Sequence, residues 1–215
     1  MKKKVFLLVG LVFLAVFTYY FTSIIIARVK TKGIVEEALA SDRMKLELDD
    51  LSHEQLDGLI KVQDPNFYHH KGVDFKTPGT GVTTISQGLV KFYYFDNFRP
   101  GPQKIKQTLI ARFAFDPLTP KDTILKLFIN EAYLGQENGK PLKGFENAAQ
   151  YFFGKEFKKL EWDEYLSLIS MIRAPFTFHY FDEREKNLER VSRIKKVLAG
   201  EYIPVDNSDL FYDKR

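Results

Sequence analysis

One polar stretch of the chain, Lys61–Lys91, gathers the residue types that could do chemistry. It holds an amide beside an acid, Gln63 and Asp64, and then two adjacent histidines, His69 and His70, in the letters QDPNFYHHKG. A carboxylate can accept a proton and an imidazole can hold or pass one, so such a mixture is typical of a site rather than of a core. We therefore expect the functional site to be built around this stretch.

The second half of the stretch, GTGVTTISQGLVK, predicts a Gly-rich turn that runs into a helix. Gly79 and Gly81 permit backbone conformations that other residues resist, and Thr83 or Thr84 is a suitable N-cap. A helix start offers free N–H groups and the positive end of a dipole, which suit an anion such as phosphate, with Lys91 two turns further on. A capped surface helix after an ordinary turn explains the same residue types equally well.

These letters resemble motifs of the family 51 peptidoglycan glycosyltransferases. QDPNFYHHKG is similar to their E-D-x-x-F-x-x-H-x-G, GVTTISQGLVKF to G-G-S-T-I-T-Q-Q-x-x-K-N, and the QKIKQ that begins at Gln103 to R-K-x-x-E. The stretch Gly144–Lys155 is similar to G-x-x-x-A-A-x-x-Y-F-G-K. The resemblance runs from Ser52 to Leu198, and it implies the mainly helical, lysozyme-like fold of that family.

The resemblance also implies a reaction and a set of site residues. Members of the family join lipid II units: a sugar hydroxyl attacks an anomeric carbon and a polyprenyl pyrophosphate departs. Gln63 then occupies the general-base position and Gln107 the second catalytic glutamate position. The implied substrate-binding residues are His70, Thr84, Gln87, Lys91 and Lys104.

The two amides matter because an amide cannot take a proton at neutral pH. General-base catalysis contributes about 10²–10⁴-fold to a rate, whereas the retained lysines could still bind a pyrophosphate. Asp64 or Asp74 could substitute as the acid, although Asp64 equally well caps or orders a turn. Two spacings also depart from the family pattern. The stretch between the first two motifs is shorter by about a helix, and the interval after QKIKQ is one residue longer.

A metal site has little support in the sequence. His69, His70 and Asp74 could supply two or three ligands, but no HExxH pattern and no further histidine cluster accompany them. We expect no metal ligands in the protein. The sequence makes no cofactor certain, while a divalent cation could accompany the pyrophosphate.

The N-terminus predicts a membrane anchor. After three lysines, Val5–Ala27 is a run without a single charge, long enough to cross a bilayer as a helix and longer than the apolar region of a cleaved signal peptide. Lys2, Lys3 and Lys4 favour the inner face for the N-terminus, and Arg28, Lys30 and Lys32 weaken that bias.

We therefore expect an anchor at 1–27, a linker or short helix at 28–51, a domain at 52–200 and a loose tail at 201–215. Within the domain we expect helices over 103–115, from Thr119 to Gly135, over 161–173 and over 182–198. With 215 residues and 45% hydrophobic content the chain can bury one core behind its anchor. The aromatic stretch Tyr93–Pro102 could touch lipid or form a partly buried loop.

Composition limits the classes of partner that the protein can be expected to bind. A net charge of +4 fits an anionic membrane or a phosphate-bearing substrate and is too mild for nucleic acid. The chain has no cysteine, so it has no disulfide or thiolate framework.

Two functions remain open on the sequence. One is a peptidoglycan glycosyltransferase-like enzyme that acts on lipid II from the outer, periplasmic face of a bacterial cytoplasmic membrane. The other is a catalytically inactive relative that binds lipid II or glycan and acts through cell-wall assembly partners. A lysozyme-like hydrolase is weaker, because it would need an acid where Gln63 stands.

Overall fold

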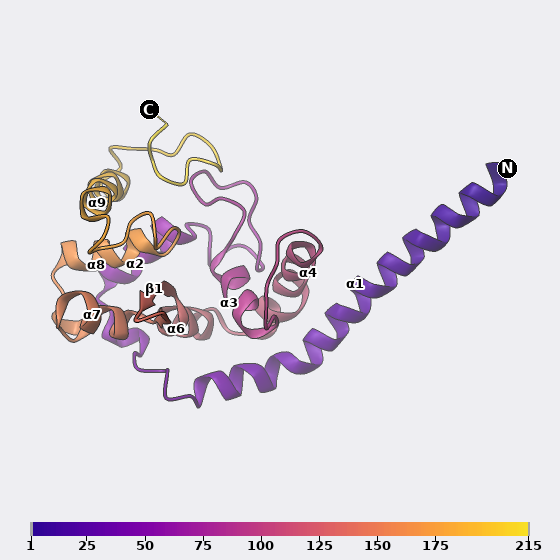
Figure 1. Cartoon of the computed structure of the whole chain (residues 1–215), viewed down its shortest axis with the longest axis horizontal. Helices are drawn as coiled ribbons and strands as arrows, with labels where there is room; N and C mark the ends of the chain where they lie inside the picture. Colours follow the sequence, from indigo (N-terminus) through magenta and orange to yellow (C-terminus); the bar gives the residue numbers. More distant parts are fainter. Residues whose placement is uncertain (1, 215) are drawn as a thin grey trace.

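The computed structural model describes residues 2–214, and its most prominent feature is one long helix, α1 (Lys2–Leu39). Figure 1 shows α1 projecting away from the rest of the molecule, with its N-terminal end far from the domain. Its most apolar 18-residue stretch is long and apolar enough to cross a membrane and is not buried inside the protein. The predicted anchor and the first part of the predicted linker therefore form a single helix that is longer than expected.

The C-terminal half of α1 packs on the domain. The Tyr20 hydroxyl donates to the Pro102 carbonyl at 3.3 Å, and the Thr31 and Tyr94 hydroxyls lie 2.7 Å apart. The Arg28 guanidinium donates to the Phe113 carbonyl. These contacts cover three turns of helix, so the anchor and the domain are joined by packing as well as by the chain.

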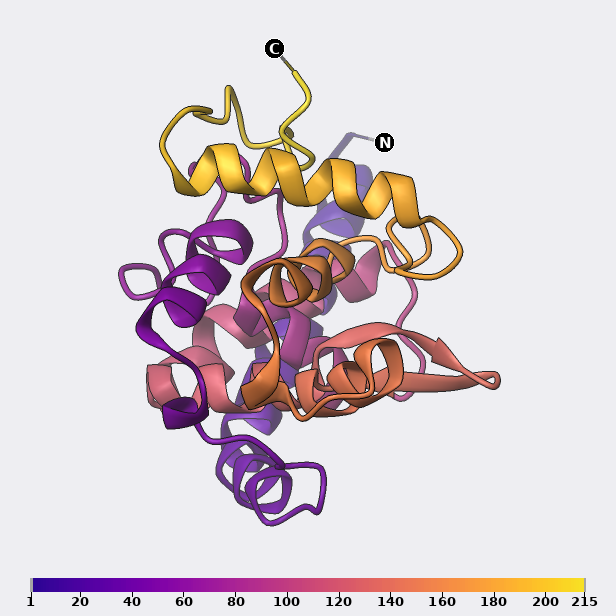
Figure 2. The same ribbon diagram turned by 90° about the vertical axis from the view of Figure 1, so that its left-hand side faces the viewer.

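The domain is mainly helical, as predicted. Its helices are α2 (His53–Gln63), α3 (Ile85–Tyr93), α4 (Pro102–Ile110), α5 (Asp116–Leu118), α6 (Lys121–Glu131), α7 (Phe145–Phe153), α8 (Trp162–Met171) and α9 (Arg184–Leu198), with 3₁₀ turns η1 (Leu48–Asp50) and η3 (Phe157–Lys159). Residues 165–171 of α8 are all buried, as an apolar helix surrounded by others should be. Figure 2 shows α8 in the middle of the domain, below α9 in this view.

The predicted helix over 103–115 contains an irregular turn. After α4 the chain forms a π-helix, η2 (Ala111–Phe115), and continues into α5. A π turn takes up one more residue than an α turn. The π-helix thus takes up one residue more than a regular α-helical turn would over this stretch.

A β-hairpin replaces the last turn of the helix that we expected to end at Gly135. Helix α6 ends at Glu131, and β1 (Tyr133–Glu137) then pairs antiparallel with β2 (Lys140–Lys143). Asn138 and Gly139 both have positive φ, 50° and 76°, as a tight hairpin turn requires. The Asn-Gly pair was the available signal for this hairpin. Figure 2 shows the hairpin projecting from the domain.

The segment after α9 is packed, which corrects the expectation of a loose tail. The Tyr212 hydroxyl donates to the Val62 carbonyl at 3.2 Å, and Asp209 is buried. The amides of Gly79 and Gly81 each donate at 2.8 Å to carbonyls of this segment, those of Asp206 and Asn207. Residues 202–214, called the C-terminal strap below, therefore cover the Gly-rich turn.

Candidate functional site

The site begins where α2 ends. A capping box of Ser52 and Gln55 starts this helix, and its last residue, Gln63, is buried. The Gln63 side-chain amide donates to the Ile169 carbonyl at 3.3 Å, and the Gln63 backbone carbonyl accepts from Arg173 Nη2 at 2.9 Å. Ile169 of α8 and Arg173, two residues after that helix, thus fix the position that the family resemblance assigned to the general base.

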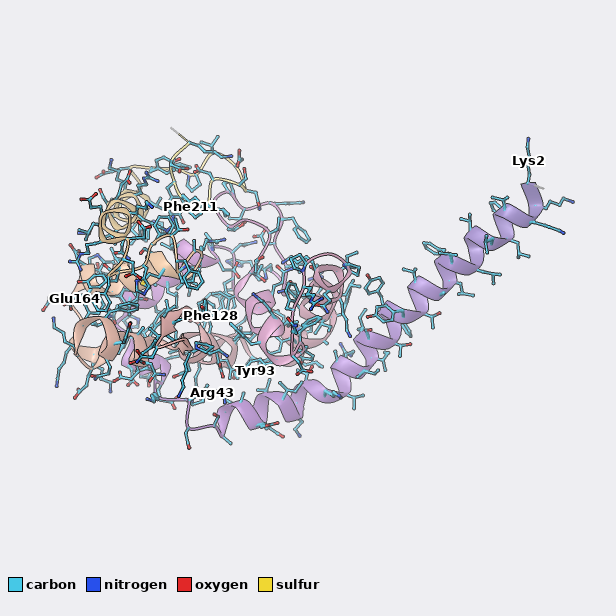
Figure 3. All side chains as sticks on the ribbon, in the orientation of Figure 1. Lys2, Arg43, Tyr93, Phe128, Glu164 and Phe211 are labelled. Atoms are coloured by element: carbon cyan, nitrogen blue, oxygen red, sulfur yellow. The ribbon has the colours of Figure 1, made fainter. Side chains whose placement is uncertain are left out.

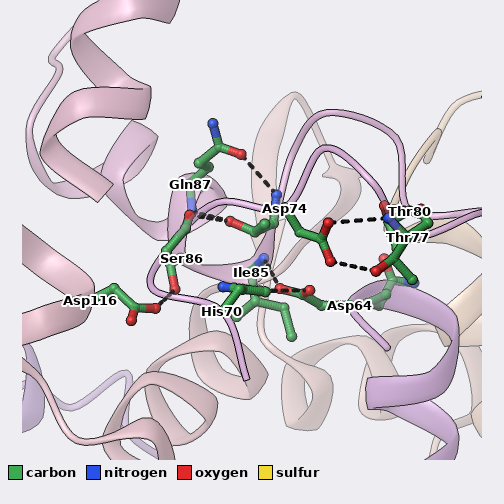
Figure 4. A network of polar contacts seen from close by, with 12 residues as sticks. Asp64, His70, Asp74, Thr77, Thr80, Ile85, Ser86, Gln87 and Asp116 are labelled. Atoms are coloured by element: carbon green, nitrogen blue, oxygen red, sulfur yellow. Dashed lines mark hydrogen bonds and ion pairs between the residues drawn. The ribbon is translucent and has the colours of Figure 1, made fainter. Parts of the chain in front are cut away.

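Asp64 is fully buried and both of its carboxylate oxygens have partners (Figure 4). Oδ1 lies 2.8 Å from His70 Nε2, and Oδ2 accepts from the Ile85 amide at 3.0 Å. A carboxylate that accepts from a backbone amide at the start of a helix is a capping group. Asp64 therefore links the end of α2, His70 and the start of α3.

The start of α3 is capped from within the protein. Thr84 and Gln87 form a capping box, and the Thr84 hydroxyl also lies 2.8 Å from the Gly72 carbonyl. Because the amides of residues 84, 85 and 87 all have partners, this helix start does not offer them to an anion. The structure favours the alternative that we left open in the sequence, a capped helix.

Asp74 orders the turn that precedes α3. Its Oδ1 accepts from the Lys76 and Thr77 amides at 2.8 and 3.1 Å, and the Thr77 hydroxyl donates to Oδ2 at 2.6 Å. Burial opposes ionisation of Asp74, but these hydrogen bonds outweigh it and lower the pKa to about 2. Such a carboxylate is a poor proton acceptor, so this geometry does not favour Asp74 as a substitute base.

Lys91 and Lys104 lie near each other on α3 and α4. Burial and then the charge of Lys91 lower the pKa of Lys104, whose ammonium donates to the Thr83 hydroxyl at 3.0 Å. Among the described residues, no carboxylate forms an ion pair with either lysine. Two neighbouring cations without acidic partners suit an anionic ligand.

Gln107 lies inside the protein rather than in an open cleft. Its side-chain amide donates to the Gln87 carbonyl at 2.5 Å, and its buried Oε1 has no hydrogen-bond partner among the described residues. The Gln87 side chain in turn donates to the Thr108 hydroxyl at 2.9 Å. Gln87 and Gln107 thus join α3 to α4.

A cleft of about 550 Å³ opens beside Gln63. Its lining includes five aromatic residues, which are Phe92, Phe128, Tyr133, Phe176 and Phe211, and two cations, Lys91 and Arg173. Figure 3 marks Phe128 of α6 and Phe211 of the strap. Among the described residues that line the cleft there is no aspartate or glutamate. The cleft therefore presents an apolar, positively charged surface without a proton acceptor of the carboxylate type.

Comparison with known proteins identifies the family of this domain. Residues 31–199 match the family model described as Transglycosylase, which is well over half of the chain. The chain belongs to the transglycosylase family. The match covers α2 to α9 and the C-terminal end of α1, so it includes every element that contributes Gln63, Asp64, Lys91, Lys104 and Gln107.

Curated proteins similar to this transglycosylase-family chain are penicillin-binding proteins. It is 26% identical over 170 residues to penicillin-binding protein 1B of Haemophilus influenzae, covering 73% of this chain and 22% of that protein. It is 27% identical over 161 residues to penicillin-binding protein 1B of Escherichia coli, covering 69% and 19%. It is 29% identical over 176 residues to penicillin-binding protein 1A of Vibrio cholerae, covering 75% and 21%. The chain thus spans about a fifth of the length of these relatives.

Several residues of the transglycosylase-family cleft escaped the sequence analysis. Arg173 lies two residues after the end of α8, and a charged residue close to the end of an apolar helix was the available signal. Burial lowers its pKa, and its buried Nε has no hydrogen-bond partner within residues 2–214. Leu210 and Phe211 line the cleft from the strap, and no local pattern marked them.

The residues present do not form a metal site. No group of three or more His, Cys, Asp or Glu side chains that could hold a metal ion occurs among the described residues. His70 is hydrogen-bonded to Asp64, whereas His69 is exposed. A divalent cation carried by a pyrophosphate remains a prediction from the family resemblance.

Proposed function

We propose that this transglycosylase-family protein binds lipid II in the cleft beside Gln63 and contributes to peptidoglycan assembly without polymerising the glycan itself. The observation that carries the proposal is the cleft lining, which contains Lys91 and Arg173 but no carboxylate among the described residues. Cations and aromatic rings can bind a pyrophosphate-linked sugar, whereas the attack of a sugar hydroxyl needs a group that removes its proton.

The pyrophosphate is proposed to bind at Lys91 and Lys104. These two ammonium groups repel each other and no described carboxylate pairs with them, so an anion between them would relieve the repulsion. Thr83, which accepts from Lys104, lines the cleft and can donate its hydroxyl to a phosphate oxygen.

The sugar is proposed to lie toward Tyr133 and Phe176. These two rings line the cleft with centroids 6.3 Å apart, and the apolar face of a sugar ring packs well on aromatic rings. The amide of Gln63 can donate to or accept from a sugar hydroxyl, but it cannot take the proton.

No other acid in the described part of the cleft compensates for the amide at position 63. Asp64 is buried, and its two oxygens already bind His70 and the Ile85 amide. Use of Asp64 as a base would break the cap of α3. The lack of a substitute base favours ligand binding over catalytic turnover. A protein that binds lipid II without turnover would act through cell-wall assembly partners.

The proposal includes anchoring by α1 to the bacterial cytoplasmic membrane, with the domain on the outer face. Lipid II is itself held in a membrane by its polyprenyl chain. A single span would therefore keep the cleft close to the surface where the ligand lies.

The test is glycan-chain formation from labelled lipid II by the full-length protein, with binding measured in parallel. We expect binding without polymer. Two variants, Gln63→Glu and Gln63→Glu/Gln107→Glu, ask whether carboxylates at these positions restore turnover, and Asp64→Asn serves as the control for a substitute base.

Polymer made by the unaltered protein and lost in Asp64→Asn would overturn the non-catalytic part of the proposal and support the glycosyltransferase alternative. Absence of both polymer and binding would overturn lipid II as the ligand while leaving the family membership intact.

A further inference from the structure

A second cavity lies between α1 and the domain, away from the Gln63 cleft. It has a volume of about 410 Å³ and is lined by α1, by the end of α3 with the turn after it, and by α4. Its charged residues are Lys30 of α1, Asp96 of the turn and Lys106 of α4. No residue of this cavity also lines the Gln63 cleft.

The cavity lies along the part of α1 in which the uncharged run ends. Its lining on α1 extends from Ser23 to Ile34, which is roughly 16 Å of helix at 1.5 Å per residue. The uncharged run of α1 ends at Ala27, inside this interval. If α1 crosses a bilayer as proposed above, the cavity therefore lies at the level of the lipid headgroups, with Ser23 and Ile26 on the hydrocarbon side and Lys30 on the water side.

The two lysines of the cavity are free to bind an anion. Among the described residues, neither Lys30 nor Lys106 forms an ion pair with a carboxylate. The Lys106 ammonium lies 5.9 Å from the centroid of the Tyr19 ring and 5.8 Å from that of Phe95. These rings hold the Lys106 side chain beside α1 without neutralising it.

The charge of the lining selects the kind of anion. Lys30 and Lys106 contribute two positive charges and Asp96 one negative charge, so the net charge is +1. A single phosphodiester carries one negative charge and neutralises the lining, whereas a pyrophosphate carries more negative charge than the lining can neutralise. The adjacent apolar side chain Ile26 is 51% exposed on the hydrocarbon side, where it can contact an acyl chain.

We propose that this cavity binds the headgroup of an anionic glycerophospholipid, with its phosphodiester between Lys30 and Lys106 and an acyl chain along Ile26. The inference rests on the proposed membrane anchoring of α1, but not on the occupant of the Gln63 cleft. A bound lipid would fill the space between the anchor and α4, and so would fix the angle at which the domain meets the membrane.

The experiment is native mass spectrometry of the full-length protein in detergent, titrated with phosphatidylglycerol or with phosphatidylcholine of the same acyl chains. We expect one phosphatidylglycerol to bind about tenfold more tightly than phosphatidylcholine. Lys30→Gln/Lys106→Gln should reduce this preference to less than threefold. The control, Lys32→Gln/Lys140→Gln, removes the same charge from exposed positions outside the cavity and should leave the preference unchanged.

A third variant distinguishes the site from simple damage to the fold. Asp96→Asn raises the net charge of the lining to +2 and should strengthen phosphatidylglycerol binding about threefold, a gain that misfolding cannot produce. Equal preference in the double variant and its control would overturn the site, as would the absence of any headgroup preference in the unaltered chain. Release of the protein from vesicles by alkaline carbonate would instead overturn the membrane anchoring itself.

Discussion

Arg173 is placed to decide how firmly the Gln63 cleft holds a ligand. Its Nη2 binds the Gln63 carbonyl, while its buried Nε has no partner in the described part of the protein. Desolvation of a guanidinium is unfavourable unless its donors are satisfied. A ligand oxygen in the cleft would satisfy the remaining donors of Arg173, so part of the binding energy should come from this residue.

We expect Arg173→Met to weaken lipid II binding by about tenfold or more, because a hydrogen bond to a charged group contributes about 1.5–3 kcal/mol. The methionine keeps an apolar stem in the cleft. Arg184→Met is the matched control, since Arg184 is exposed and stacks on Tyr180 outside the cleft. Titration with labelled lipid II measures both variants, and equal affinities would exclude a role for Arg173.

Asp74 should make the stability of the Gly-rich turn depend on pH. Its pKa is lowered from the ordinary value of 3.8 to about 2 in the folded protein, so its contribution is full above about pH 4 and is lost as the pH falls through 2. Asp74→Asn should therefore cost roughly 2 kcal/mol at pH 7 and almost nothing near pH 2.

Thermal melting followed by the fluorescence of Trp162 measures this difference. At pH 7 we expect a melting temperature about 4–8 °C lower for the variant, given the size of the domain. Asp206→Asn is the control. Asp206 also has a pKa of about 2, but it is exposed and paired with Lys214, and an exposed ion pair contributes little stability, so this variant should melt close to the unaltered protein. If the melting temperature of Asp74→Asn stayed as far below that of the unaltered protein near pH 2 as at pH 7, the stabilising role assigned to ionised Asp74 would be wrong.

The sequence singled out a stretch whose polar residues lie together in the structure, but it could not assign each residue a task. Asp64, His70, Thr84 and Gln87 were identified as a group. Figure 4 shows Asp64, His70 and Gln87 close together, and Thr84 is hydrogen-bonded to Gln87. In the structure they cap and join helices. A spacing of residues along the chain cannot distinguish a side chain that faces a ligand from one that caps a helix, because both need the same donors and acceptors at a helix start.

Among the elements, the C-terminal strap has the largest effect on the shape of the site. It contributes Leu210 and Phe211 to the cleft and holds the Gly-rich turn through two backbone hydrogen bonds. Buried Arg190 donates to the Leu210 carbonyl at 3.1 Å and lies 5.1 Å from the Phe211 ring centroid. The strap is therefore held from both sides, by α9 and by the turn.

The packing of the strap can be tested at Gly79. A methyl group there would lie 2.9 Å from the Pro204 ring and 3.2 Å from the Tyr212 ring. Gly139 has nearly the same φ, 76° against 77°, but open space around it. Both alanine variants carry the strain of positive φ, so only Gly79→Ala should add an overpacking cost, about 1–3 kcal/mol. Equal melting temperatures for the two variants would show that the strap is not held here.

The remaining elements show where a sequence pattern predicts secondary structure well and where it does not. Helices α8 and α9 lie within two residues of their predicted spans, since apolar periodicity and end signals agree there. The π-helix η2 could not be predicted from periodicity, because one inserted residue leaves the apolar pattern of the flanking turns intact. The strap was missed because several of its contacts are to residues more than 100 positions away, such as Val62 and Gly79.

At the scale of the whole molecule, α1 joins the candidate membrane span to the domain as one continuous helix. After α1, Asn130 binds the backbone of Lys45 and Leu46 at 2.9 and 3.0 Å, and Arg43 pairs with buried Glu131 at 2.8 Å. The chain is thus held against the end of α6 within a few residues of the helix. The domain should therefore keep a defined position relative to the membrane rather than swing on a flexible tether.

That defined position makes the orientation of the chain testable. Lysines flank the uncharged run on both sides, so charge alone decides little, and the proposed lipid II ligand is what favours the domain on the outer face. The chain has no cysteine, so Lys2→Cys and Glu156→Cys each create a single exposed thiol, one at either end of the molecule. In intact spheroplasts, a membrane-impermeant maleimide should label Glu156→Cys and should label Lys2→Cys only after lysis. The reverse pattern would place the domain in the cytoplasm, on the side away from the proposed ligand.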